Sequence, residues 1–198
     1  MIGKEDIIII ESSGERDISA EYFTMQLWKS RNYKLKETGK QNTELQKLKI
    51  EFLTEFSFVE YLCSELSLHF DSKVLDWSIN KAELNDRNIL LVGINEAKTQ
   101  RTIREKTIEL KTYHTGKVTV EEILGLNPYT QPMKTFIDLL SYPKTDIFVQ
   151  AYLLTDNSIA LTGFRRGFLK HTGTRPEFYA QKYVTELFKM KELINEFL

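Results

Sequence analysis

One long apolar stripe constrains the fold of this chain more than any other feature. Over residues 43–70, large apolar side chains recur every three or four positions, the spacing that places them on one face of an α-helix. The stripe consists of Leu45, Leu48, Phe52, Phe56, Val59, Cys63, Leu66 and Phe70. Thr43 can cap the start of this helix. A helix with one apolar face has to pack that face against another layer of structure.

After Asp71 the pattern changes to short runs rich in β-branched and aromatic residues, which predict β-strands. The five runs are 73–79, 88–94, 106–112, 146–154 and 158–164. Residues 155–157 join the last two runs as a tight hairpin. A helix is predicted over 133–140, between Pro132 and Pro143, and an amphipathic helix over 175–198.

This order of elements predicts an α/β (α+β) fold, in which a mixed central β-sheet is flanked by helices. At 198 residues the chain fits one domain. We divide it into an N-terminal arm (1–42), a core (43–170) and a C-terminal helix (175–198). The arm contains an apolar run over 6–17, which predicts a strand or a docking segment. It also contains a basic, aromatic stretch over 22–40 that suits a substrate-binding arm or a dimer contact.

Composition excludes several classes of protein. A formal net charge of -1 argues against a chain wholly devoted to polyanions, although a local basic surface remains compatible with it. The single cysteine excludes an internal disulfide, and with only three histidines it argues against structural zinc. No apolar run approaches the roughly 18–20 residues that cross a bilayer, so we expect a cytoplasmic protein with no membrane partner.

A Glu-x-Lys sequence stands on the third predicted strand, in TIELKTYHTG (107–116). Since side chains alternate along a strand, Glu109 and Lys111 share one face while Ile108 and Leu110 share the other. A carboxylate can hold a divalent ion, and a neighbouring lysine can supply charge to a phosphate or accept a proton. The pair therefore forms half of a site for phosphodiester cleavage. The alternative is a solvated surface pair that contributes little stability.

With these elements around Glu-x-Lys, residues 43–170 resemble the PD-(D/E)XK nuclease superfamily, which has the restriction-endonuclease-like fold. The resemblance implies that Glu109 and a second acid bind Mg²⁺, for which Mn²⁺ would substitute. It also implies that Lys111 positions or deprotonates the attacking water. The expected function is a metal-dependent DNA endonuclease, a phosphodiester hydrolase acting in restriction, in phage or mobile-element processing, or in repair. Residues 146–167 are similar to the strand pair that ends many small members.

Three residues compete for the role of the second acid, because no Pro-Asp sequence precedes the motif. If residues 88–97 and 105–112 form a hairpin with its tip near 100–104, Glu96 lies opposite Glu109. Asp86 requires a displaced register, and Asp76 requires a hairpin that folds differently. We rank Glu96 first, Asp86 second and Asp76 third.

A second Glu-x-Lys sequence lies in NEAK (95–98), and Asp86 stands ten residues before its glutamate. In this alternative, Glu96 and Lys98 are the catalytic pair and 106–112 is an adjacent core strand. Glu96 belongs to both versions of the site.

Two further residues are candidates for the site. Glu55 lies about 50° from the centre of the helical stripe, so it could lean toward a metal at the sheet edge, or pair with a lysine as a boundary residue. Gln150 is a polar residue within an apolar strand, and it needs a hydrogen-bond partner if buried. A site carboxylate, a water or a DNA phosphate would serve as that partner.

Basic residues gather in two places where they could contact DNA phosphates. The segment between Asp156 and Glu177 contains no acid. Its cations are Arg165, Arg166, Lys170 and Arg175. The second group, at the expected hairpin tip, consists of Lys98, Arg101, Arg104 and Lys106. The alternative for each group is an ordinary solvated surface.

Two other functions remain open. A non-catalytic nucleic-acid-binding or assembly protein could keep the fold without the metal site, and the missing Pro-Asp favours that alternative. An RNA-cleaving toxin would use the same chemistry on a different substrate. A homodimer is also possible, because a two-fold enzyme cuts both strands of a duplex most simply.

Overall fold

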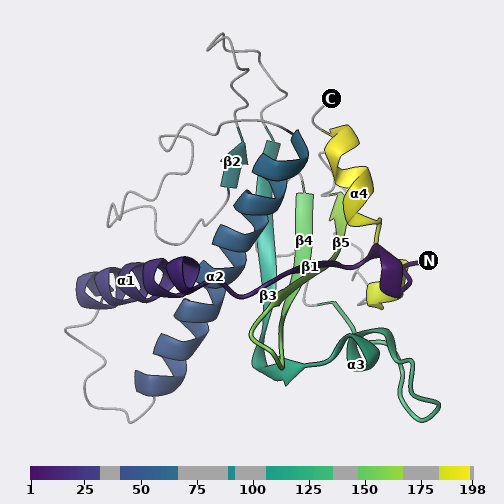
Figure 1. Ribbon diagram of the computed structural model, residues 1–198, viewed down its shortest axis with the longest axis horizontal. Helices are drawn as coiled ribbons and strands as arrows, with labels where there is room; N and C mark the ends of the chain where they lie inside the picture. Colours follow the sequence, from purple (N-terminus) through teal and green to yellow (C-terminus); the bar gives the residue numbers. More distant parts are fainter. Residues whose placement is uncertain (32–40, 67–88, 92–105, 136–146, 167–182, 197–198) are drawn as a thin grey trace, which may run out of the picture.

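The computed structural model describes residues 1–31, 41–66, 89–91, 106–135, 147–166 and 183–196. These residues form three layers (Figure 1), in which helix α2 (Gln41–Leu66) lies between helix α1 (Gly14–Arg31) and a five-stranded sheet. The strands are β1 (Ile8–Ile10), β2 (Ile89–Leu91), β3 (Lys106–Val118), β4 (Ile147–Leu154) and β5 (Ile159–Arg166). No helix in the described part of the chain is long and apolar enough to cross a membrane.

The sheet is mixed, as the sequence predicts. Its strand order is β1-β5-β4-β3-β2, and only β3 and β4 are parallel to each other. A parallel pair needs a crossover connection, and this one contains the short helix α3 (Val120–Leu124). Thr119 begins α3 with a capping box, since its Oγ1 accepts from the Glu122 N–H at 3.2 Å and Glu122 Oε2 accepts from the Thr119 N–H at 2.8 Å. Gly125 ends α3 in the left-handed conformation at φ 63°.

A hydrophobic core covers each face of the sheet. On one face, Phe58 and Leu62 of α2 pack against Ile108 and Val149 of the sheet, and all four are fully buried. On the other face, Tyr152 of β4 packs with residues from the N-terminal segment, α3 and the C-terminal segment. Residues of this second cluster include Ile2, Ile7, Ile123, Leu124, Val184 and Leu187. The central strands are therefore buried on both sides, which explains why their sequences are continuously apolar.

Most local predictions for the core are confirmed. The helix predicted over 43–70 is α2, which is described as far as Leu66. The runs at 106–112, 146–154 and 158–164 are β3, β4 and β5, and the last two form the expected antiparallel hairpin. Only β2 is described within the run 88–94, and the run 73–79 lies outside the described residues. The N-terminal arm contains a 3-10 turn, η1 (Lys4–Asp6), followed by β1 and α1, and β1 adds to the sheet edge beside β5.

The prediction of one continuous C-terminal helix over 175–198 is wrong in the described part, where only 190–193 are α-helical. Residues 183–196 instead form two 3-10 turns, η2 (Val184–Glu186) and η3 (Ile194–Glu196), and a short helix, α4 (Met190–Leu193). The backbone of Phe188 pairs with Phe164 of β5 through two N–H to O=C bonds of 2.9 and 3.0 Å. These pairings with the sheet replace the internal bonds that a helix would make.

The helix predicted over 133–140 is wrong where it is described. Lys134 forms a β-bridge with Tyr183, and Met133 O accepts from the Val184 N–H at 2.9 Å. The backbone at 133–134 is therefore engaged with the C-terminal segment. Residues 136–140 lie outside the described part.

An ion pair joins the two ends of the described chain. Lys189 Nζ lies 3.0 Å from Asp6 Oδ1, and Asp6 Oδ2 accepts from the Gly3 N–H at 3.0 Å. The Gly3 N–H and the Lys189 ammonium hold the pKa of the Asp6 carboxyl below its ordinary value. Because folding lowers this pKa, the contribution of Asp6 to stability is present above the ordinary value of 3.8 and is lost as pH falls through the lower folded-state value.

We therefore expect Asp6→Asn to lower the free energy of unfolding at pH 7 and to flatten its dependence on pH in the acid range. Urea unfolding at several pH values would measure both effects. Glu11→Gln, which changes an exposed carboxylate of the same segment, is the control. Equal acid dependence in Asp6→Asn and the wild-type protein would contradict this role for Asp6.

Candidate functional site

The two faces of β3 separate the Glu-x-Lys positions from the α2 core. Ile108 is fully buried against α2, and Leu110 packs against the same cluster. Tyr113 lies on the opposite face, where its ring centroid is 5.6 Å from that of Tyr152. Because strand positions alternate, positions 109 and 111 belong to the face that carries Tyr113. The predicted division of β3 into two faces is confirmed by these contacts.

The residues registered beside Glu109 and Lys111 on the neighbouring strands form two rows across the sheet. Glu109 is registered beside Phe148 of β4, which is opposite Arg165 of β5. Lys111 is registered beside Gln150, which is opposite Gly163.

Directly paired residues share a face, and strands lie about 4.8 Å apart, so each row spans roughly 10 Å between β3 and β5. The positions of Glu109, Lys111, Gln150 and Arg165 thus belong to one face of the sheet, on three adjacent strands.

Gln150 is completely buried, and its side chain binds the main chain of the neighbouring strand. Its Nε2 donates to Lys111 O at 3.0 Å and to Ala151 O at 3.4 Å. Gln150 is thus buried and hydrogen-bonded, but these partners are main-chain carbonyls rather than the expected carboxylate, water or DNA phosphate, and its role beside a site stays a prediction. Gln150 therefore fixes the backbone from which the Lys111 side chain projects.

A β-bulge lies next to this row. The register between β4 and β5 shifts between Gln150 and Ala151, and the additional residue, Thr162, donates from Oγ1 to Gln150 O at 3.1 Å. Bulges bend a strand and change the direction of its side chains. Gly163 follows, and a Cβ there would lie 2.7 Å from Phe188 O. Glycine therefore allows the C-terminal segment to pass close to β5 beside the site.

The two arginines at the end of β5 have different surroundings. The run predicted as a strand ends at residue 164, whereas the structure continues β5 through Arg166. Arg166 Nε donates to Glu196 Oε1 at 2.7 Å, and its guanidinium lies 5.0 Å from the centre of the Phe188 ring. Arg166 therefore holds the C-terminal segment, and Glu196 balances its charge. Arg165 stands on the face of the Glu109 row, a position that continued strand alternation could have revealed.

The register of β2 is described only next to the expected pairing of Glu96 with Glu109, because Glu96 lies outside the described residues. Ile89 pairs with Ile108, and Leu91 pairs with Lys106. In an antiparallel ladder one number rises as the other falls, so the same register, if it continued beyond the described pairs, would bring position 88 opposite Glu109.

Several predicted site residues lie outside the described part of the chain. The acids among them are Asp76, Asp86 and Glu96, and the cations are Lys98, Arg101, Arg104, Lys170 and Arg175. Their proposed roles stay predictions. Among the described residues there is no group of three His, Cys, Asp or Glu side chains that could hold a metal ion.

Glu55 is half-buried on α2, which covers the face of Ile108 and Leu110. The structure therefore brings Glu55 to the opposite side of the sheet from the face that carries Lys111. This arrangement does not favour Glu55 as a metal ligand beside Glu109.

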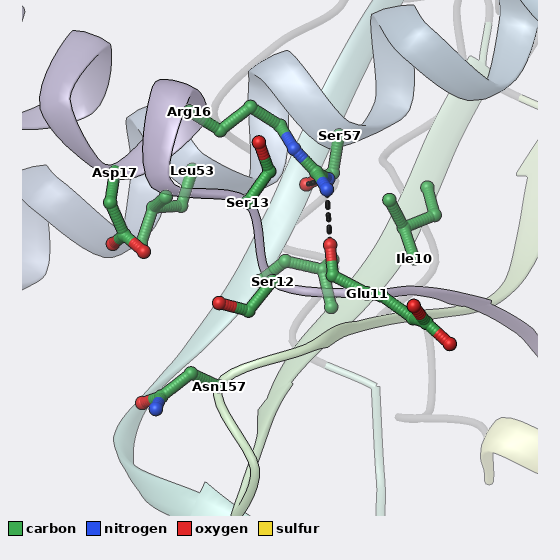
Figure 2. Close-up of a pocket in the computed structure, with 10 residues that line it drawn as sticks. Ile10, Glu11, Ser12, Ser13, Arg16, Asp17, Leu53, Ser57 and Asn157 are labelled. Atoms are coloured by element: carbon green, nitrogen blue, oxygen red, sulfur yellow. Dashed lines mark hydrogen bonds between the residues drawn. The ribbon is translucent and has the colours of Figure 1, made fainter.

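A small cavity lies at a different place, where β1 meets α1, α2 and the β4–β5 turn (Figure 2). Arg16 crosses it, and its Nη2 donates to Glu11 O while its Nη1 donates to Ser57 Oγ at 2.9 Å. Arg16 Nε also lies 3.2 Å from Glu60 Oε2. Through these contacts the Arg16 guanidinium joins the β1–α1 connection to α2. We therefore assign the residues around this cavity a structural role.

Comparison with known proteins gives no match to a family model, to a curated protein or to a solved structure. The functional argument therefore depends on the residues of this chain and on the arrangement of its strands.

Proposed function

We propose that this protein is a Mg²⁺-dependent DNA endonuclease with a site of the PD-(D/E)XK type centred on Glu109 and Lys111. The observation that carries the proposal is the pair of rows across β3, β4 and β5, which gathers Glu109, Lys111 and Arg165 positions on one face. The setting of β3 also supports it. This strand follows a long helix, has an antiparallel neighbour on one side, and is followed by a crossover to a parallel neighbour.

We propose Asp86 as the second acid in place of Glu96. The observed pairing of Ile89 with Ile108 supports this choice, since continuing the same register by three pairs would bring position 86 opposite Lys111. Residues that are directly opposite share a face, so an acid at 86 would join the face of Glu109 and Lys111. The displaced register that Asp86 requires is thus the one that the described pairs favour.

The donor set fits a hard divalent cation. Two carboxylates, those of Glu109 and Asp86, match the preference of Mg²⁺ for a few oxygen ligands, with water and phosphate completing its coordination. When bound, such an ion stabilises the negative charge that develops on a phosphate during hydrolysis and acidifies a bound water.

The remaining residues supply charge and rigidity. Lys111 carries positive charge to the scissile phosphate or takes the proton of the attacking water. Arg165, across the sheet from Glu109, binds a phosphate of the same DNA strand and so helps fix its position. Gln150 keeps the Lys111 backbone in place through its bond to Lys111 O, which limits the movement of the lysine during reaction.

The decisive experiment incubates the protein with supercoiled plasmid in Mg²⁺, in Mn²⁺ and in EDTA. Nicking or linearisation that requires the metal supports the nuclease. Binding that persists in EDTA without any cleavage would instead support the non-catalytic binding protein, which the missing Pro-Asp favours. Parallel reactions with RNA would show whether the substrate is DNA.

A binding prediction follows for Arg165. We expect Arg165→Ala to weaken DNA binding in Ca²⁺ and to reduce the log–log dependence of affinity on salt by about 0.9, the effect of one lost phosphate contact. Fluorescence anisotropy across a salt series would measure both quantities. Lys117→Ala is the matched control, because this exposed cation lies near the other end of β3 and its Nζ contacts Asn157 at 2.5 Å. An unchanged slope in Arg165→Ala would place the DNA elsewhere.

A further inference from the structure

Helix α1 has one face packed against α2 and another face whose side chains are exposed. Ala20 and Thr24 are buried, and Phe23 and Trp28 pack with Leu48 and Phe52 of α2. This face accounts for the attachment of α1 to α2, on the side of α2 that is away from the sheet (Figure 1).

The other face of α1 carries a row of five exposed residues at alternating steps of three and four. The row, which we call the α1 stripe, consists of Glu15, Ile18, Tyr22, Met25 and Lys29. At 100° per residue these positions fall within one narrow sector of the helix. Its three apolar members are 72% (Ile18), 59% (Tyr22) and 41% (Met25) exposed. A contiguous exposed apolar row of this kind marks an interaction surface.

We propose that the α1 stripe pairs with the α1 stripe of a second copy of this chain, in an antiparallel arrangement with a two-fold axis at Tyr22. Charge complementarity identifies this occupant. Glu15 stands seven residues before Tyr22 and Lys29 stands seven residues after it. In the antiparallel pair, each Glu15 therefore meets Lys29 of the other copy, and Ile18 of one copy packs near Met25 of the other.

The charges also select the orientation. A parallel pair would bring Glu15 against Glu15 and Lys29 against Lys29, which is repulsive. Within the described part of the chain, neither Glu15 nor Lys29 forms an ion pair, whereas the nearby Asp17 and Glu21 both approach Lys49 of α2. The two charges at the ends of the stripe are thus positioned for a partner, and those beside the stripe serve the contact with α2.

The size of the stripe sets the expected strength. From Glu15 to Lys29 it is roughly 21 Å long at 1.5 Å per residue. It offers five residues per copy, compared with about 20–30 per partner in a standard stable interface. The dimer is therefore weak, with a dissociation constant in the micromolar range or above, and it should form as concentration rises.

Sedimentation velocity of the full chain, from about 1 to 200 µM, tests the apolar part of the pairing. We expect the wild-type protein to shift from monomer to dimer across this range, and Ile18→Glu to weaken dimerisation at least tenfold. Leu126→Glu places the same charge on an exposed leucine outside α1 and should dimerise like the wild-type protein. A wild-type protein that stays monomeric throughout, or an Ile18→Glu variant that dimerises normally, would overturn the proposal.

Charge reversal tests the antiparallel register. Glu15→Lys and Lys29→Glu should each weaken the dimer, because each creates two like-charge contacts. The double variant Glu15→Lys/Lys29→Glu should restore dimerisation, and so should an equimolar mixture of the two single variants. The restored association should weaken with added salt, as expected for exposed charges. A fold damaged by either change could not be rescued by mixing, so failure of both rescues would reject this register.

Discussion

Lys111→Ala is expected to reduce the rate of metal-dependent DNA cleavage at least 100-fold, which corresponds to about 2.7 kcal/mol of transition-state stabilisation. The reason is the proposed role of Lys111, whose position shares a face with the positions of Glu109 and Arg165 and which would supply positive charge to the reacting phosphate. Single-turnover cleavage with enzyme in excess isolates the chemical step from product release.

DNA affinity provides the internal comparison for this variant. In Ca²⁺, Lys111→Ala should bind DNA within a few-fold of the wild-type protein, because the lost interaction is specific to the transition state. Lys117→Ala, on the same strand, should cleave at the wild-type rate, which separates the role of position 111 from the loss of any lysine on β3. Cleavage at the wild-type rate by Lys111→Ala would remove the central residue of the proposed site.

The elements that the sequence predicts correctly are those set by local pattern. The three-to-four spacing defines α2, and the apolar runs around a short turn define the β4–β5 hairpin, because side-chain periodicity and turn chemistry act over neighbouring residues. The same reasoning assigns Glu109 and Lys111 to one face of β3, since alternation along a strand needs no knowledge of its neighbours.

The elements that the sequence misses depend on contacts between distant segments. Residues 183–196 have an amphipathic pattern, yet Phe188 pairs with Phe164 and Val184 bonds to Met133, and these tertiary bonds replace a continuous helix. Arg166 lies in a basic segment that suggests contact with DNA, but its guanidinium bonds to Glu196, which is 30 residues away in the sequence. Propensity and charge counts carry no information on such partners.

The register of β2 against β3 is another feature that the local sequence pattern does not determine. A hairpin tip near 100–104 is reasonable from the polar residues there, but the observed pairing of Leu91 with Lys106 is displaced from the pairing this tip requires. Register is set by which residues each strand buries, and a displacement changes which acid can meet Glu109. The choice of a second acid for the proposed metal site therefore depends on strand register, which local sequence pattern does not determine.

The β2–β3 register leads to the second prediction with a large expected effect, which compares Asp86 with Glu96. Asp86→Asn should reduce Mg²⁺-dependent cleavage at least 100-fold, because losing one of two carboxylates weakens both metal binding and the stabilisation of charge on the phosphate. Glu96→Gln and Lys98→Ala should each have a mild effect, since the alternative Glu-x-Lys of residues 95–98 is then outside the site.

Thermal unfolding gives a second readout that does not depend on activity. Mg²⁺ or Mn²⁺ bound by Glu109 and Asp86 should raise the melting temperature progressively with metal concentration, because only the folded protein presents the site. Asp86→Asn should abolish that rise while leaving the metal-free melting temperature unchanged or higher, because two neighbouring carboxylates repel each other. Glu96→Gln should keep the full rise. The reverse pattern, with Glu96 and Lys98 essential and Lys111 dispensable, would contradict the proposed site and move it to residues 95–98.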